Sequence, residues 1–325
     1  MADTLQTGKA RGSQLVCAAQ IARETEVRQS PNGVQFATYG ETGVADLELD
    51  QMLEAVPTAI TAALNANTYY FVPLAMREPI ESFNPTAAHK TTQTEPTMVA
   101  SDYTEELSEA AICHRNVDLD HGRRGVFIST RLMGDRFALS FEFFINVAHA
   151  FVDKTGVPTE FADLVWKQAL DNVRGETSAD AWESRNVTFG RQANALPEAF
   201  QASSRRNRSA NFGFAMEKRT FAGGIVKESR PDGAALQLNA SAQQTTEVKP
   251  VIDEKERGLY LAAAFSDSVA IYLLSLALDF DYSELREREY PLLVPVALAA
   301  RLRLVAELYP SNAGYEFAVR YRRRA

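Results

Sequence analysis

The chain has 325 residues, of which 46% are hydrophobic and 23% charged, a balance typical of a folded globular protein rather than a disordered one. Its formal net charge of −8 argues against a general nucleic-acid coat protein, because such proteins usually carry a positive overall field. Cys17 and Cys113 are far apart and belong to no CxxC pair, so neither a disulfide framework nor a thiolate zinc site is indicated. The first residues lack the pattern of a secretory signal, and we expect a cytoplasmic protein.

Residues 1–45 are polar, with turn signals around Pro31-Asn32-Gly33 and a possible strand at 34–39, and we interpret them as an N-terminal arm or edge element. Residues 46–325 are expected to form a single α+β domain. Its first helix is predicted at 46–66, where apolar residues recur every three or four positions and Pro57 should kink or split the helix. An aromatic, β-prone segment at 68–74 predicts a strand.

After a long polar insertion at about 76–110, the clearest prediction is a hairpin at about 126–147, with its turn at Met133-Gly134-Asp135. In its second strand, apolar residues alternate with small or polar ones, which is the period of a sheet with one buried face. Only Phe144 breaks the alternation. We therefore expect an antiparallel sheet built around this hairpin and packed with several amphipathic helices.

The remaining helices are predicted at 159–173, 259–280 and 291–309, and the last two should pack together through apolar stripes, which in the last helix consist of Leu292, Val296, Ala299, Leu302, Val305 and Leu308. The apolar stretch 259–278 is interrupted by Ser266-Asp267-Ser268, which favours a buried helix over a membrane span. A second polar insertion at about 174–255 contains a predicted hairpin around Pro231-Asp232-Gly233, and a final strand is predicted at 315–321.

A cluster of histidines and aspartates is the first candidate site. All four histidines lie between residues 89 and 149, and the predicted hairpin register would place His149 opposite Asp118 to Asp120. Imidazoles combined with carboxylates suit a divalent transition metal such as zinc, which could activate water for hydrolysis. The candidate metal ligands are His114, Asp118, Asp120, His121 and His149. The alternative is structural, because aspartates are common in turns, histidines at a sheet rim usually bond to their neighbours, and the spacing matches no zinc signature.

An arginine-rich segment is the second candidate site. Between Ser203 and Phe214, arginines are combined with small polar residues and aromatics, a composition that can hold a phosphate backbone and stack on a base. The candidate anion-binding or nucleic-acid-binding residues are Arg205, Arg206, Arg208, Lys218 and Arg219. The alternative is a solvated basic loop that pairs with the acidic surface of the same or a neighbouring subunit.

These observations favour a non-enzymatic subunit of a larger assembly, either a homo-oligomer or a multi-subunit complex, with no cofactor. Polar stretches as long as the two insertions are unusual inside a compact monomer, and contacts with neighbouring subunits would order them. The arginine-rich segment would contact an acidic surface or a nucleic-acid backbone. The alternative is a metal-dependent hydrolase that uses the His/Asp cluster. No phosphate-binding loop, Gly-x-Ser-x-Gly motif or kinase motif is present.

Overall fold

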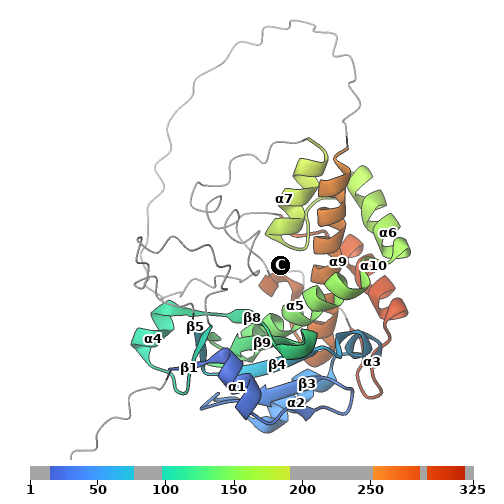
Figure 1. Cartoon of the computed structure of the whole chain (residues 1–325). Helices are drawn as coiled ribbons and strands as arrows, with labels where there is room; N and C mark the ends of the chain where they lie inside the picture. Colours follow the sequence, from blue (N-terminus) through green and yellow to red (C-terminus); the bar gives the residue numbers. More distant parts are fainter. Residues whose placement is uncertain (1–14, 77–96, 191–251, 286–290, 319–325) are drawn as a thin grey trace, which may run out of the picture.

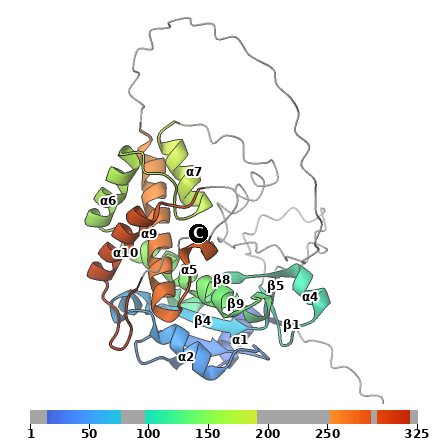
Figure 2. The same ribbon diagram turned by 180° about the vertical axis from the view of Figure 1, so that it is seen from behind.

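The protein combines helices with two β-sheets, so the predicted α+β class is confirmed (Figure 1). The structure is a computed structural model that describes residues 15–76, 97–190, 252–285 and 291–318. The strands are gathered at one end of the molecule and most of the longer helices at the other, with one long helix between them. Figure 2 shows the same two-part arrangement from behind.

The larger sheet has five strands in the order β2-β3-β4-β9-β8. They are β2 (Arg28–Gln29), β3 (Gln35–Thr38), β4 (Asn67–Val72), β9 (Arg124–Ser129) and β8 (His114–Asp118). The three central strands are parallel, whereas β2 and β8 run antiparallel to their neighbours at the two edges. A helical crossover joins β3 to β4, as parallel pairing requires. It consists of α2 (Asp46–Glu54), α3 (Thr58–Thr61) and the 3-10 helix η1 (Ala62–Leu64), with a break at Pro57 as predicted.

The smaller sheet has four antiparallel strands in the order β1-β6-β5-β7. They are β1 (Leu15–Cys17), β6 (Met98–Ala100), β5 (Leu74–Met76) and β7 (Ala111–Ile112). Helix α1 (Ala18–Glu24) follows β1, and α4 (Glu105–Ala110) precedes β7. The described part of the N-terminal segment therefore contributes strands to both sheets.

Strand β4 is buried on both faces. Tyr69 and Phe71 belong to the large core that includes the helices, whereas Tyr70 and Val72 belong to a second core formed with α1 and the smaller sheet. Because neither face meets water, the strand is a continuous apolar run rather than an alternating one. The larger sheet is thus the middle layer of the strand-rich end of the protein.

The predicted hairpin at 126–147 is wrong in its second half. Its first strand is present as β9, followed by the 3-10 helix η4 (Thr130–Leu132), but the residues from 136 onward form a helix, α5 (Arg136–Thr155). Asp135 starts this helix, because its side chain accepts a hydrogen bond from the backbone N–H of Ala138. α5 packs against β9 and against helix α9 (Glu254–Ala277) and is buried around most of its circumference. Its apolar residues consequently satisfy the strand period as well as the helix period.

At the helical end, α9 lies in the centre and contacts α5, α6 (Thr159–Leu170), α7 (Ala179–Thr188) and α10 (Pro295–Leu308). Three of these helices, α6, α9 and α10, correspond to the predictions at 159–173, 259–280 and 291–309. α9 is long and apolar enough to cross a membrane, but 78% of its most apolar window is buried inside the protein. This burial agrees with the predicted core helix.

Other predictions are corrected or lie outside the described residues. α7 falls within the predicted polar insertion at 174–255, whereas the hairpin predicted around Asp232 is outside the described part. Residues 315–318 have no regular structure where a strand was predicted. On α10 the buried face is formed by Ala297, Leu298, Arg301, Leu302 and Val305, so Val296, which was assigned to the buried stripe, is 82% exposed.

Candidate functional site

The arginine-rich segment lies outside the described residues, since Arg205, Arg206, Arg208, Lys218 and Arg219 all fall within 191–251. The structure therefore bears on this candidate site only through the surfaces that the rest of the chain presents.

The candidate metal ligands are divided between the interior and the surface. His114 is buried on β8, and His149 lies on α5 close enough for the charge of His114 to act on it. Asp118, at the far end of β8, has a side chain that is 97% exposed and lies 3.9 Å from the Nε of Arg124. Asp120 and His121 are exposed on the 3-10 helix η3 (Asp120–Gly122).

The hairpin that was to bring these five residues together does not exist, which removes the geometric reason for a common site. Only His114 and His149 are brought close, and they meet because α5 packs beside the sheet. In the described part of the chain, no three His, Cys, Asp or Glu side chains are grouped as metal ligands would be. Metal binding by these residues stays an untested prediction.

His114 instead contacts a carboxylate. Its Nδ1 lies 2.5 Å from the Oε1 of Glu142, and both side chains are buried. Asn146 lies one helical turn further along α5 and donates from Nδ2 to the same Oε1 at 3.3 Å. Glu142, Asn146 and His149 are spaced by four and three residues, so they form a polar stripe along one side of α5. This stripe fixes the edge strand β8 to the helix.

The electrostatics of this cluster suit a structural role. Burial, with a smaller contribution from His114, lowers the pKa of His149 to about 4, so His149 is neutral near neutral pH. Burial and the Glu142 carboxylate raise the pKa of the nearby Cys113 thiol to about 12. A thiol with such a high pKa is a poor nucleophile, because the thiolate is the reactive form.

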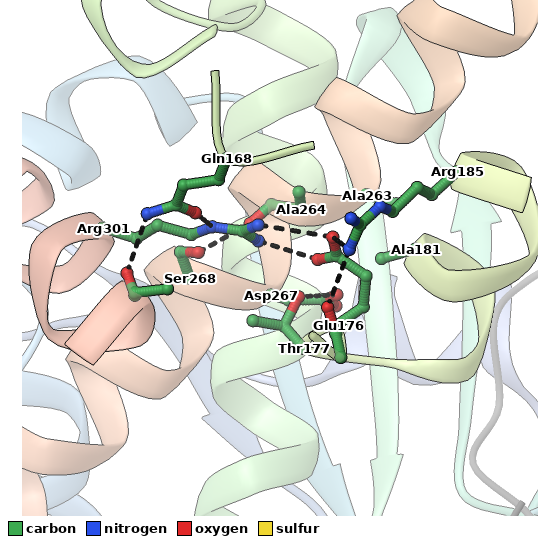
Figure 3. Close-up of polar contacts among 12 residues, drawn as sticks. Gln168, Glu176, Thr177, Ala181, Arg185, Ala263, Ala264, Asp267, Ser268 and Arg301 are labelled. Atoms are coloured by element: carbon green, nitrogen blue, oxygen red, sulfur yellow. Dashed lines mark hydrogen bonds and ion pairs between the residues drawn. The ribbon is translucent and has the colours of Figure 1, made fainter. Parts of the chain in front are cut away.

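A second buried polar cluster joins the helices, and sequence reasoning missed it (Figure 3). Its centre is Glu176, on the segment between α6 and α7. The guanidinium of Arg301, from α10, donates to Glu176 at 2.9 and 3.4 Å, and Arg185, from α7, donates to it at 3.1 Å. Gln168 accepts a hydrogen bond of 2.8 Å from the Nε of Arg301. Glu176 and Arg301 are both fully buried.

The cluster also holds two residues of α9. Tyr260 donates to Glu176 at 2.6 Å, and burial together with the Glu176 charge raises the pKa of this phenol. Asp267 accepts a hydrogen bond of 2.8 Å from Thr177, and burial raises the pKa of Asp267 to about 6. With Asp267 ionised, two carboxylates face two guanidinium groups and the cluster is neutral. Such pairing is what makes buried charges tolerable.

The backbone around Glu176 is held as tightly as its side chain. Glu176 donates to the carbonyl of Pro291, and Leu293 donates to the carbonyl of Glu176. Gly175, beside it, has φ of +86°, and a Cβ at this position would clash with the carbonyl group of Leu292. The position therefore requires glycine, for its backbone conformation and for the close approach of the second chain segment.

A surface groove of about 500 Å³ lies beside α10, and the charges of Arg301 and Glu176 act on Tyr282 in its lining. Pro295, Val296, Ala299 and Arg303 of α10 also line it, as does Phe317. Tyr282 belongs to the 3-10 helix η5 (Tyr282–Leu285). Arg303 is the charged residue of this mostly apolar lining. Concave, mostly apolar surfaces of this kind are common binding sites.

Comparison of the chain with protein-family profiles, with curated proteins and with solved structures found no match.

Proposed function

We propose that the chain is a non-enzymatic subunit of a larger assembly, homo-oligomeric or multi-subunit. In this proposal the arginine-rich segment containing Arg205, Arg206 and Arg208 contacts an acidic surface or a nucleic-acid backbone. The observation that carries the assembly role is the apolar surface of α10, where Val296 is 82% exposed beside the groove of about 500 Å³. Apolar surface gathered at one place on a soluble protein typically marks an interaction site.

The buried ionisable groups support a structural rather than a catalytic role. Glu176 is held by Arg185 and Arg301, and Glu142 by His114, so these charges are engaged with one another inside the fold. None of these residues lines the α10 groove. A catalytic acid or base must reach the substrate within hydrogen-bonding distance.

Analytical ultracentrifugation across the micromolar range tests the assembly role. We expect the weight-average mass to rise above that of a single chain as the concentration increases, because association follows mass action. A compact monomer at every concentration, alone and after incubation with cell extract, would overturn the proposal.

The interaction of the arginine-rich segment with nucleic acid is tested with a fluorescent single-stranded oligonucleotide in a salt series. Changing Arg205, Arg206 and Arg208 to alanine should weaken binding and reduce the salt slope by about 0.7 for each phosphate that is no longer neutralised. In a matched control variant, the exposed Arg23, Arg136 and Arg174 are changed to alanine. This control has the same net charge as the triple variant in the arginine-rich segment, and it should bind the oligonucleotide as the wild type does. If oligonucleotide binding by the wild type does not depend on the salt concentration, contact with a nucleic-acid backbone is excluded. If the triple substitution does not change the assembly of the protein, contact with an acidic protein surface is excluded.

A further inference from the structure

The two most exposed large apolar side chains in the described part of the chain are Val296, at 82%, and Leu47, at 70%. Val296 stands at the rim of the α10 groove, next to the apolar faces of Pro295 and Ala299. Leu47 is at the start of α2, in the second position of the helix. These two side chains are therefore the strongest candidates in the described surface for burial against another molecule.

Their surroundings carry opposite charges. Leu47 is flanked by the exposed carboxylates Asp46 and Asp50, which share one side of α2 because they are spaced by one helical turn, and a nearby cation, Arg136, is paired with Glu48 at 3.6 Å. We call Asp46, Leu47 and Asp50 the Leu47 knob. The α10 groove presents the exposed Arg303 beside its apolar lining. An apolar side chain flanked by carboxylates thus matches an apolar groove flanked by a guanidinium group.

We propose that the Leu47 knob of one copy of this chain inserts into the α10 groove of another copy. This inference rests on the proposed role as an assembly subunit, and it names the partner and the surfaces that meet. Leu47 would pack against Val296 and Phe317, while Asp46 or Asp50 would pair with Arg303. The area of such an interface is small, so neighbouring surface must add to it in a stable assembly.

The interface would be head to tail. In Figures 1 and 2, α2 lies at the strand-rich end and α10 at the helical end, although the segment after α10 returns to α2, where Tyr315 donates to the carbonyl of Gln51. A head-to-tail pair uses one knob and one groove and leaves one of each free. Such interfaces repeat and produce rings or open chains instead of closed dimers.

Two substitutions disrupt the interface from its opposite sides. Leu47→Lys places a cation against Arg303, and Val296→Asp places a carboxylate against the acidic knob. Leu47→Ser removes the apolar side chain of the knob without adding a charge and is a milder form of Leu47→Lys. Val296 is in the first turn of α10, where an aspartate suits the helix dipole. The control is Leu15→Lys, because Leu15 is 42% exposed on β1 of the smaller sheet, which carries neither the knob nor the groove. Circular dichroism and thermal melting check that each variant folds.

We expect each of the two variants to associate at least about tenfold more weakly than the wild type in sedimentation velocity, and Leu15→Lys to associate normally. The decisive measurement mixes Leu47→Ser with Val296→Asp, because the charges introduced by Leu47→Lys and Val296→Asp would attract each other. The Leu47→Ser protein keeps an intact groove and the Val296→Asp protein keeps an intact knob, so the mixture should form pairs that neither variant forms alone, and these pairs should not grow further.

The outcomes separate this interface from the broader proposal. A wild type that stays monomeric overturns the assembly role, and the interface with it. A wild type that associates while both variants associate equally well overturns the interface only. Loss of association in Val296→Asp but not in Leu47→Lys assigns a different occupant to the groove, and a mixture that stays monomeric excludes the head-to-tail arrangement.

Discussion

His149 lies on α5 beside His114, where burial and the neighbouring imidazole lower its pKa from the ordinary 6.5 to about 4. The unfolded chain therefore takes up a proton below about pH 6.5 that the folded chain does not, and stability is lost as the pH falls toward 4. Because His149 is only partly buried, we expect His149→Gln to reduce the acid loss of unfolding free energy between pH 6.5 and 4.5 by about 1–2 kcal/mol. Urea unfolding at several pH values measures the unfolding free energy of both proteins. Equal losses of unfolding free energy in the two proteins between pH 6.5 and 4.5 would contradict the low pKa of His149.

Asp267 acts in the opposite direction. Burial raises its pKa from 3.8 to about 6, so the folded protein holds the proton more tightly and this contribution to stability decreases as the pH rises from about 4 to 6. Relative to the wild type, Asp267→Asn should therefore gain about 2–3 kcal/mol of unfolding free energy between pH 4 and 7. Asp153→Asn, on the exposed side of α5, is the control and should shift the curve by a constant amount. Parallel curves for Asp267→Asn would show that its carboxyl titrates normally.

At the scale of elements, the Glu176 cluster connects α6, α7, α9 and α10. Replacing Arg301 with methionine leaves Glu176 buried with one cation fewer, and we expect a loss of about 3 kcal/mol or more in the free energy of unfolding. Arg303→Met, two residues along on the exposed face of α10, should change it by less than about 0.5 kcal/mol. The double variant Glu176→Gln with Arg301→Met should recover part of the loss, because both charges are then gone. Equal denaturation midpoints for the two arginine variants would disprove the role of the cluster.

The N-terminus of α5 gives a second prediction at this scale. Asp135→Ala removes the side-chain acceptor for the Ala138 N–H and should cost about 1 kcal/mol of stability. Asp153→Ala, near the other end of the same helix, removes a carboxylate that makes no such cap and should cost nothing, since an acidic residue is unfavourable there. Equal stabilities of the two variants would show that Asp135 does not cap the helix.

The correctly predicted elements include helices whose apolar residues follow the helical period over many residues, and a helix with a clear break. The helices α6 and α9 were placed by their periodicity, and the break in the first helix by Pro57. α5 was mistaken for a strand because a helix buried on nearly every side has apolar residues that fit both periods. The hairpin register was the reason to expect Asp118 and Asp120 opposite His149, and the helical structure of α5 removes that reason.

The Glu176 cluster was out of reach for a different reason. Its members are far apart in the chain, with 125 positions between Glu176 and Arg301, and only tertiary packing brings them together. One signal was available: Arg301 falls at helical spacing between the apolar Ala297 and Val305, which indicates a charged side chain on a buried face. The predicted buried face of this helix included Val296 instead of Ala297, so the buried position of Arg301 was not recognised.

For the molecule as a whole, a single large core extends from β4 and β9 through α5 and α9 to α10. We therefore expect the two ends to unfold together in one cooperative transition. Trp166 and Trp182 report on the helical end by fluorescence, and hydrogen exchange of β4 reports on the sheet. Separate denaturation midpoints for the two probes would show that the ends are independent units.

The position of Arg301, 125 residues after Glu176, has a consequence for biosynthesis. Glu176 is translated 125 residues earlier, and at about 5–20 residues per second its main counter-ion follows roughly 6–25 s later. During that interval, the emerging helices α6 and α7 hold a carboxylate that cannot yet be buried with its partner. The helical end can therefore close only after the ribosome has passed α10, and a nascent chain arrested before that point would present unfinished interior surface to chaperones.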